Sequence, residues 1–416
     1  MMKNIDSPAL QDERAGILDA LRGFALLGIL LANSAVFSLY IFHSPAQRES
    51  FFTAPVDGVL NFLGHAFIEG KFYSIFSLLF GIGFSIIFLR NKNKGNNGLP
   101  IFYRRLFILL LFGLCHSFLL WDGDILFFYA LAGMLLPLFR NSSNKTLLWL
   151  SLILILSPLL FDTLKIISNG KWNIANPFLE KAMAIDKRNG IEGLYAGNWL
   201  ITHGSYGDLL KWSESGFWWG WQFRLDGNRV MKVFAMFLLG LYVGRNQLYL
   251  KLENHKPLLI KLQLWGLGIG IPAGLAFAWF ESDKKSLPAF EGIWDTLMYA
   301  LNVAPLAIGY VATITLWYLK GRFSKILSWL QPVGRMALTN YIMQSVMGVL
   351  IYYGIGLGLG GRFGPALYMP IAFVLFLLQI IYSNWWFTYF IYGPLEWIWR
   401  QLTYGKRLAF RKPHSR

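Results

Sequence analysis

About ten apolar segments of membrane length divide this chain, and they constrain its fold more than any other feature. A helix of roughly 20 predominantly apolar residues crosses the hydrocarbon layer of a bilayer. Such segments fall near residues 22–42, 71–90, 103–121, 124–140, 146–167, 229–245, 257–280, 292–319, 336–358 and 366–390. With 55% hydrophobic and only 14% charged residues, the composition excludes a soluble protein of 416 residues. We therefore predict an all-α fold, a polytopic α-helical membrane protein with about ten transmembrane helices.

The basic residues indicate how these segments are oriented. Lysines and arginines gather in alternate loops, for example at Arg104 and Arg105 and again at Arg140 and Lys145. Because cytoplasmic loops carry this excess, we predict that both termini are cytoplasmic. The formal net charge of +16 is then a topology signal. No basic soluble segment is present to hold a duplex, so we expect the lipid bilayer as a partner and no nucleic acid.

One long polar segment separates the fifth apolar segment from the sixth. We predict a single membrane-embedded domain over residues 1–416, with a long external loop near 168–228. The second half of this loop, residues 212–229, is rich in Trp and Gly. Two interpretations remain open for it: an interfacial aromatic belt, or a lid or carbohydrate-stacking surface over an external cleft.

His116 is the most unusual residue of the apolar segments. It lies within the third segment, between Arg105 on one side and Asp122 and Asp124 on the other. At about 1.5 Å rise per residue, His116 is about 16 Å from Arg105, near the middle of the hydrocarbon layer. An ionisable side chain at that depth is costly, and histidine can act as base, acid or proton relay near neutral pH. We predict a functional role for it.

Amide side chains lie at a similar depth in two other segments. Asn33 is about 16 Å into the first segment and Gln344 is about 13 Å into the ninth, both measured from the same membrane face. Asn340, Tyr341, Gln344 and Ser345 share a helical face by their three- and four-residue spacings, which predicts one inward polar stripe. Together with His116 these residues indicate a polar cavity at the midplane. The alternative is that the amides only join helices by hydrogen bonds.

Further ionisable residues gather at the two membrane surfaces. We expect Asp19, Arg22, Arg104 and Arg105 on the cytoplasmic side and Lys71, Asp122 and Asp124 on the external side, as ligand-binding candidates. For Asp19 and Arg22, three residues apart, a structural ion pair is an equal alternative. No sequence motif of a serine triad, a zinc protease or a paired-carboxylate metal site is present, so we expect no metal.

Five blocks of sequence resemble those of a known family. They are LDALRGFALLGILLAN (18–33), GKFYSIFSLLFGIG (70–83), RRLFILLLFGLCHSFLLWDGDILFFYALAG (104–133), GRMALTNYIMQS (334–345) and GPLEWIWRQLTYG (393–405). In this order they resemble the YeiB-like bacterial membrane proteins, a family defined by a domain of unknown function. The resemblance covers nearly the whole chain and implies a multi-pass protein of the bacterial cytoplasmic (inner) membrane.

That family is more distantly similar to membrane acyltransferases such as heparan-glucosaminide N-acetyltransferase. The shared D-x-x-R-G opening is here Asp19, Arg22 and Gly23. The resemblance implies transfer of an acyl group from cytosolic acetyl-CoA or another acyl-CoA, a co-substrate rather than a tightly bound cofactor, to an extracytoplasmic glycan or similar acceptor. His116 would be general base or acyl carrier, and Asn33 and Gln344 would orient it or stabilise an oxyanion.

The same resemblance gives Arg22, Arg104 and Arg105 the role of holding the acidic coenzyme at the cytoplasmic mouth. A different class of function remains open, a proton-coupled transporter of a small anionic solute with His116 as proton relay. A cytoplasmic cavity with room for a nucleotide beside these arginines would favour the enzyme. Symmetric repeats around a closed midplane site would favour the transporter.

Overall fold

The computed structural model describes residues 16–93, 95, 97–191, 196–283 and 292–413. Over these residues the chain forms helices joined by short connections, with no β-strand beyond an isolated bridge between Phe390 and Arg411. The helices are α1 (Gly16–Phe37), η2 (Tyr40–Phe42), α2 (Pro45–Glu49), α3 (Ala54–Phe67), α4 (Lys71–Asn93), α5 (Leu99–Leu119), α6 (Leu126–Leu135), η3 (Leu136–Phe139), α7 (Asn144–Ile167), α8 (Asn176–Asn189), η4 (Ala196–Asn198), α9 (Trp199–Thr202), α10 (Tyr206–Asp226), α11 (Arg229–Arg245), η5 (Leu252–His255), α12 (Lys256–Asp283), α13 (Gly292–Leu319), α14 (Ser324–Arg335), α15 (Ala337–Tyr352), α16 (Pro365–Tyr389) and α17 (Pro394–Tyr404).

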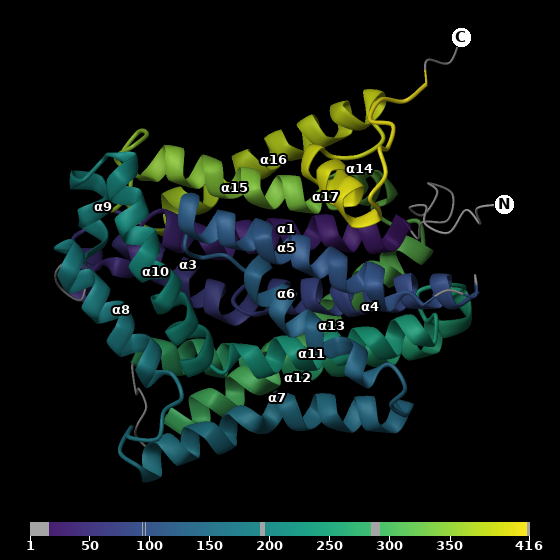
Figure 1. Ribbon diagram of the computed structural model, residues 1–416. Helices are drawn as coiled ribbons and strands as arrows, with labels where there is room; N and C mark the ends of the chain where they lie inside the picture. Colours follow the sequence, from purple (N-terminus) through teal and green to yellow (C-terminus); the bar gives the residue numbers. More distant parts are fainter. Residues whose placement is uncertain (1–15, 94, 96, 192–195, 284–291, 414–416) are drawn as a thin grey trace.

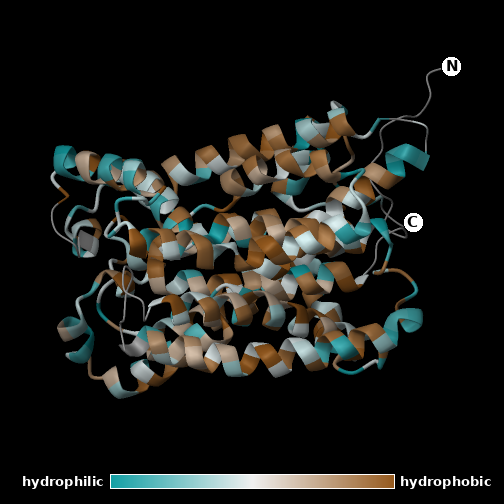
Figure 2. Cartoon of the chain, turned by 90° about the horizontal axis from the view of Figure 1, so that it is seen from below, coloured by the Kyte–Doolittle hydropathy of each residue, from teal (hydrophilic) through white to brown (hydrophobic). Residues whose placement is uncertain are grey.

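The long helices run side by side, which gives the molecule two distinct ends (Figure 1). The described part of the chain begins and finishes at one end, called here the termini end, and α8, α9 and α10 lie at the other, called here the distal end. Apolar residues dominate the middle of the bundle and polar residues gather at both ends (Figure 2). This distribution is the one expected of a bundle that spans a bilayer, because only the ends meet water.

Seven helical stretches of the described chain are long and apolar enough to cross a membrane. The chain is thus an α-helical membrane protein, as predicted. Three other predicted spans form shorter helices: α6 has 10 residues, α11 has 17 and α15 has 16. The count of ten spans and the cytoplasmic position of the termini stay predictions.

Burial divides the bundle into central and peripheral helices. More than half of the apolar stretch of α13, and of the stretch that contains α4, is buried within the protein, against about a fifth for α7 and α12. The outer helices present large apolar side chains such as Ile153, Trp265 and Ile381 at the surface. Lipid would cover these side chains, so the polar chemistry of the protein must be sought between the central helices.

Two close helix contacts position the residues of the candidate site. Gly113 of α5 lies against the start of α6, where a Cβ would come within 2.2 Å of the Phe127 nitrogen. Gly334 of α14 lies against α1, where a Cβ would come within 1.9 Å of the Asp19 carbonyl oxygen. Only glycine permits backbones to approach so closely. The first contact sets His116 beside Asp124, and the second sets α14 beside the Asp19–Arg22 turn.

The segment near 168–228, predicted as a loop, is largely helical. Helices α8, α9 and α10 form a layer at the distal end (Figure 1). The Trp-rich stretch forms part of α10 and packs on the protein: Trp212 is buried, and the Trp219 indole donates a hydrogen bond to Asp186 at 2.6 Å. Phe217 of the same helix stacks on Phe118 of α5 at 4.8 Å between ring centroids. α10 therefore covers the distal end of α5.

Candidate functional site

His116 lies at the centre of a hydrogen-bonded array of three side chains from three elements. Its Nδ1 is 2.9 Å from Oδ1 of Asp124, and its Nε2 is 2.8 Å from Oγ of Ser345. His116 comes from the last turn of α5, Asp124 from the connection to α6 and Ser345 from α15. The three are at most 3% exposed. This array is called the relay below.

Hydrogen bonds to Asp124 and to the next residue hold Asp124 in place. Its Oδ2 accepts a hydrogen bond from the Phe127 backbone N–H at 2.6 Å, so the carboxylate caps the start of α6. Arg224 of α10 donates to the backbone oxygen of Asp124. The next N–H, that of Ile125, donates to the Tyr341 hydroxyl at 3.2 Å. Asp124 is thus held by contacts with α6 and α10 in addition to its hydrogen bond with His116.

The hydrogen-bond partners assign the tautomer of the neutral imidazole. The Asp124 carboxylate only accepts, so Nδ1 carries a proton, and in the neutral ring Nε2 presents its lone pair to the Ser345 hydroxyl. This is the order of groups in a serine–histidine–aspartate triad, in which the acid holds the tautomer and the histidine takes the serine proton. The sequence has no triad motif, and the three groups come together only in the folded chain.

A cavity of about 410 Å³ reaches toward the relay from the termini end. At the mouth it is lined by five arginines, which are Arg22, Arg90, Arg105, Arg335 and Arg400. Its walls are mainly apolar, with Leu26, Leu79 and Leu109 among them, and its inner part is lined by Ile125, Tyr129 and Tyr341. It is called the arginine cavity below. Its volume lies in the range of small-molecule sites.

The acidic groups at the mouth already have partners. Asp19 forms an ion pair with Arg22 at 2.5 Å. Glu396 accepts hydrogen bonds from the Leu338 N–H at 2.7 Å and from the Thr339 hydroxyl at 2.7 Å, so it caps the start of α15. Burial raises the pKa of Glu396 above its usual value. The mouth therefore carries an excess of positive charge, suited to an anionic group.

Tyr341 separates the arginine cavity from the relay. Its side chain lines the cavity, and its ring centroid is 5.3 Å from that of His116. Ser345 lies one helical turn further along the same face of α15. A ligand in the cavity would therefore end one side chain away from His116.

The predicted polar stripe of α15 divides into two. Tyr341 and Ser345 face the α5–α6 hairpin, whereas Asn340 and Gln344 face α16. Gln344 donates to the Gln379 side chain at 2.9 Å and lies in a separate buried amide cluster. Asn340 donates to Ser383 at 3.0 Å in the same cluster. The structure does not place either amide at His116.

The remaining predicted site residues fall in different places. Asp19, Arg22 and Arg105 line the arginine cavity, whereas Arg104 is exposed with its guanidinium beside Gly405. Asn33 is half-buried, one turn beyond Ile29, the last α1 residue that lines the cavity. Lys71 is fully buried and donates to the His65 carbonyl at 2.7 Å. Asp122 is half-buried against Gly216 of α10, two residues before Asp124.

Comparison with known proteins assigns the family. Residues 243–406 match the family model described as "Protein of unknown function (DUF418)". The chain is 34% identical to the uncharacterized protein YxaH of Bacillus subtilis (strain 168), over 95% of this chain and 96% of the relative. It is 30% identical to the uncharacterized protein YeiB of Escherichia coli (strain K12), over 94% and 96%. The chain belongs to the YeiB-like family. The family prediction is therefore confirmed, and no solved structure matches the chain.

The site of this YeiB-like protein includes residues that sequence reasoning missed. Arg335 and Arg400 line the cavity from α14 and α17, which the sequence did not connect to Arg22 and Arg105. Ser345 was assigned to the polar stripe but not to His116. Its spacing of four residues from Tyr341, together with a buried histidine in need of a partner, is the signal that could have suggested it.

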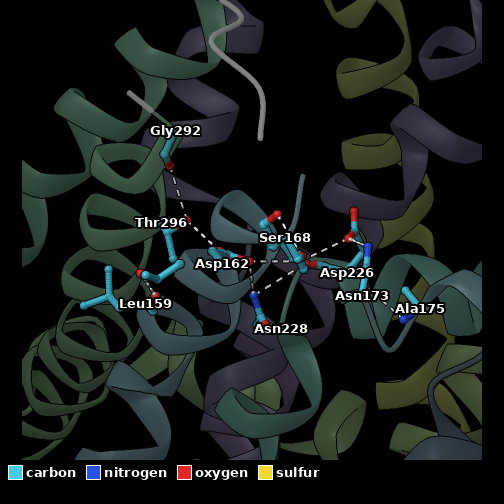
Figure 3. Close-up of polar contacts among 11 residues, drawn as sticks. Leu159, Asp162, Ser168, Asn173, Ala175, Asp226, Asn228, Gly292 and Thr296 are labelled. Carbon is cyan, nitrogen blue, oxygen red and sulfur yellow. Dashed lines mark hydrogen bonds and ion pairs between the residues drawn. The ribbon is translucent and has the colours of Figure 1, made fainter. Parts of the chain in front are cut away.

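A second buried polar group, the Asp162 cluster, lies among α7, α13 and the α10–α11 turn (Figure 3). Lys165 is 2.9 Å from Asp162 and 3.0 Å from Asp226, and Asp162 also accepts from Asn228 at 3.0 Å and Thr296 at 2.7 Å. Among the described residues no group has the composition of a metal site. Because its charges and donors are paired with one another, we interpret the cluster as a structural link that holds these helices together.

Proposed function

We propose that this protein is a transmembrane acyltransferase that moves an acyl group from a cytosolic acyl-CoA to an extracytoplasmic glycan or similar acceptor. One observation carries the proposal: an arginine-lined cavity leads from the termini end to a tyrosine that packs on a buried histidine paired with aspartate. The proposal includes cytoplasmic termini, supported by the basic residues at the termini end. It also includes a place in the bacterial cytoplasmic membrane, supported by the apolar helices and the bacterial relatives.

The cavity matches the chemistry of an acyl-CoA along its length. Guanidinium groups at the mouth suit the phosphates, because arginine binds phosphate through paired charged hydrogen bonds. The Arg105 guanidinium lies over the Trp399 ring, 3.7 Å from its centroid, and this cation–π contact holds the guanidinium in the wall of the cavity. The apolar walls suit the pantetheine arm and the acyl chain. The thioester would then lie at the inner end beside Tyr341.

The relay supplies the acid–base chemistry. His116 takes a proton from the attacking group, and Asp124 stabilises the imidazolium that forms. Tyr341 presents a hydroxyl at the inner end of the cavity, where it can donate to the thioester oxygen as negative charge develops. The sequence predicted that Asn33 and Gln344 stabilise the oxyanion. In this proposal Tyr341 does so instead, because the Gln344 amide donates its hydrogen bond to Gln379.

The proposal is tested with wild-type protein in nanodiscs and with the His116→Ala variant. Binding of acetyl-CoA, succinyl-CoA and palmitoyl-CoA is measured by calorimetry, and release of free thiol is followed with a colorimetric reagent. We expect wild type and variant to bind the same donor with similar affinity, and only wild type to release thiol. Absence of both binding and thiol release in wild type, for all three donors, would refute the acyltransferase.

A proton-coupled transporter of a small anionic solute is the second candidate. The same arginine cavity favours it, since positive charge at the mouth would also attract such a solute, and His116 could carry the proton. Proteoliposomes distinguish the two functions. Transport predicts anion uptake driven by a pH gradient with no chemical change of the solute, whereas the acyltransferase predicts thiol release without uptake.

A further inference from the structure

Ser345 differs from several buried serines in the described helices. Ser34, Ser74 and Ser151 each donate to the backbone oxygen four residues earlier, at 2.7 Å. This is the usual way for a helical serine to satisfy its hydroxyl away from water. The hydroxyl of Ser345 instead lies 2.8 Å from Nε2 of His116 on another helix. It therefore lies where a base can take its proton.

The position of Ser345 is also distinctive. On the side of the termini end, Tyr341 and the arginine cavity lie one turn away on the same helical face. Toward the distal end lie Trp121, whose ring centroid is 6.2 Å from that of His116, and the half-buried Asp122. The relay thus occupies the level between the end of the cavity and the layer formed by α10. Trp121, itself buried, covers the relay on the distal side.

We propose that Ser345 is the nucleophile that carries the acyl group between the two sides. The inference rests on the proposed function, because it takes an acyl-CoA as donor. In the first step the Ser345 oxygen attacks the thioester carbonyl while His116 Nε2 takes the hydroxyl proton. The adduct collapses, the carbon–sulfur bond breaks, and the thiolate leaves with the proton from His116. The products are a serine ester and free CoA.

In the second step the acyl group moves from Ser345 to the external acceptor. A hydroxyl or amine of the external acceptor attacks the ester carbonyl, and His116 takes its proton. The bond to the Ser345 oxygen breaks and that oxygen recovers the proton from His116. No oxidant, metal or further reactant is needed. A carrier also means that donor and acceptor need not meet, so the membrane barrier stays closed on at least one side throughout.

The test is to trap the acyl-enzyme in the absence of an acceptor. Full-length protein in nanodiscs is mixed with radiolabelled acetyl-CoA, succinyl-CoA or palmitoyl-CoA, quenched in acid, and digested for mass spectrometry. We expect about one label per chain, a matching burst of free thiol, and mapping of the label to Ser345. Ser345→Ala should lose at least 95% of the label while it binds the donor as wild type does.

Two variants provide controls for folding and chemistry. Ser151→Ala removes a buried serine of α7 that donates to its own helix, and it should label as wild type does. Ser345→Cys places a thiol at the same position, so its adduct should be a thioester that neutral hydroxylamine cleaves faster than the wild-type ester. That change in lability would not follow if Ser345 only held His116 in place.

Three results would overturn the carrier. The first is label at wild-type level in Ser345→Ala, and the second is label mapped to another residue, such as His116. The third is wild-type protein that binds donor but shows neither burst nor label in the absence of acceptor, which would indicate direct transfer between two bound substrates. In all three cases the donor still binds, so these results are distinct from a failure of the acyltransferase itself, in which wild type neither binds donor nor releases thiol.

Discussion

Replacing Asp124 by asparagine changes one atom and disrupts the hydrogen bonds on which the relay depends. The carboxylate accepts from two donors, the His116 Nδ1–H and the Phe127 N–H. Asparagine has one acceptor oxygen and cannot serve both. If its oxygen stays with the cap of α6, its NH₂ group faces Nδ1. The imidazole proton must then move to Nε2, which donates to Ser345 and can no longer take the serine proton.

The size of the effect follows from this tautomer change. The same substitution in a serine–histidine–aspartate triad costs about 10⁴-fold in rate, or about 5 kcal/mol of barrier. If instead the imidazole keeps its tautomer, one buried donor is left unsatisfied, at a cost of about 1–3 kcal/mol in stability. We therefore expect Asp124→Asn to lose acyl transfer by about 10⁴-fold with a modest drop in the unfolding temperature. Donor binding should stay within about twofold, since the arginine cavity is unchanged.

Thiol release, donor calorimetry and thermal unfolding in nanodiscs measure these three quantities. Asp57→Asn is the matched control, because Asp57 is also buried and also caps a helix, accepting from the Ala366 N–H at 2.8 Å at the start of α16. It should lose comparable stability and keep its rate. Asp124→Asn activity within tenfold of wild type would refute the assigned tautomer and the role of the relay.

Three further predictions address the cavity, the Asp162 cluster and the helix contact that sets the relay. Arg105→Ala should weaken donor binding about 10–100-fold by calorimetry, the loss expected for one charged hydrogen bond, and exposed Arg322→Gln should leave it unchanged; equal binding by both variants would contradict the cavity assignment. Lys165→Met should cost about 3–5 kcal/mol by thermal unfolding because it leaves Asp162 without its cation. Lys211→Met, which breaks an exposed pair with Asp208, should leave the unfolding temperature nearly unchanged. Gly113→Ala should push α6 away from α5 and abolish thiol release, whereas Gly268→Ala, where a Cβ meets open space, should not; full activity of Gly113→Ala would show that the relay tolerates the shift.

The sequence was enough to predict a helical membrane protein, because few backbone structures are stable in lipid. Backbone groups in hydrocarbon must bond within their own segment, so an apolar stretch of sufficient length becomes a helix. The same reasoning picked out His116, since an ionisable group at that depth is rare enough to notice. It did not predict the helices of the segment near 168–228, where aqueous contact permits both loop and helix.

The prediction of the site was limited because sequence spacing does not tell which face of each helix points inward. Residues 340, 341, 344 and 345 cover a broad face, and sequence alone could not decide which pair meets His116. Arg104 and Arg105 are adjacent in sequence, yet Arg105 lines the cavity and Arg104 is exposed. About 100° of rotation separates neighbouring residues of a helix. The neighbours of each helix decide which of two such residues points inward.

The sequence by itself determined that this chain is a helical membrane protein of the YeiB-like family with a histidine deep in an apolar segment. Length, hydrophobicity and the positions of charge are local properties, and they are enough for that. Only the tertiary structure decided that Ser345, 229 positions from His116, provides its partner, and that arginines from four further helices surround one cavity with Arg105. Such contacts depend on which helices pack together and at which glycines they approach, and no periodicity within a single helix encodes that choice.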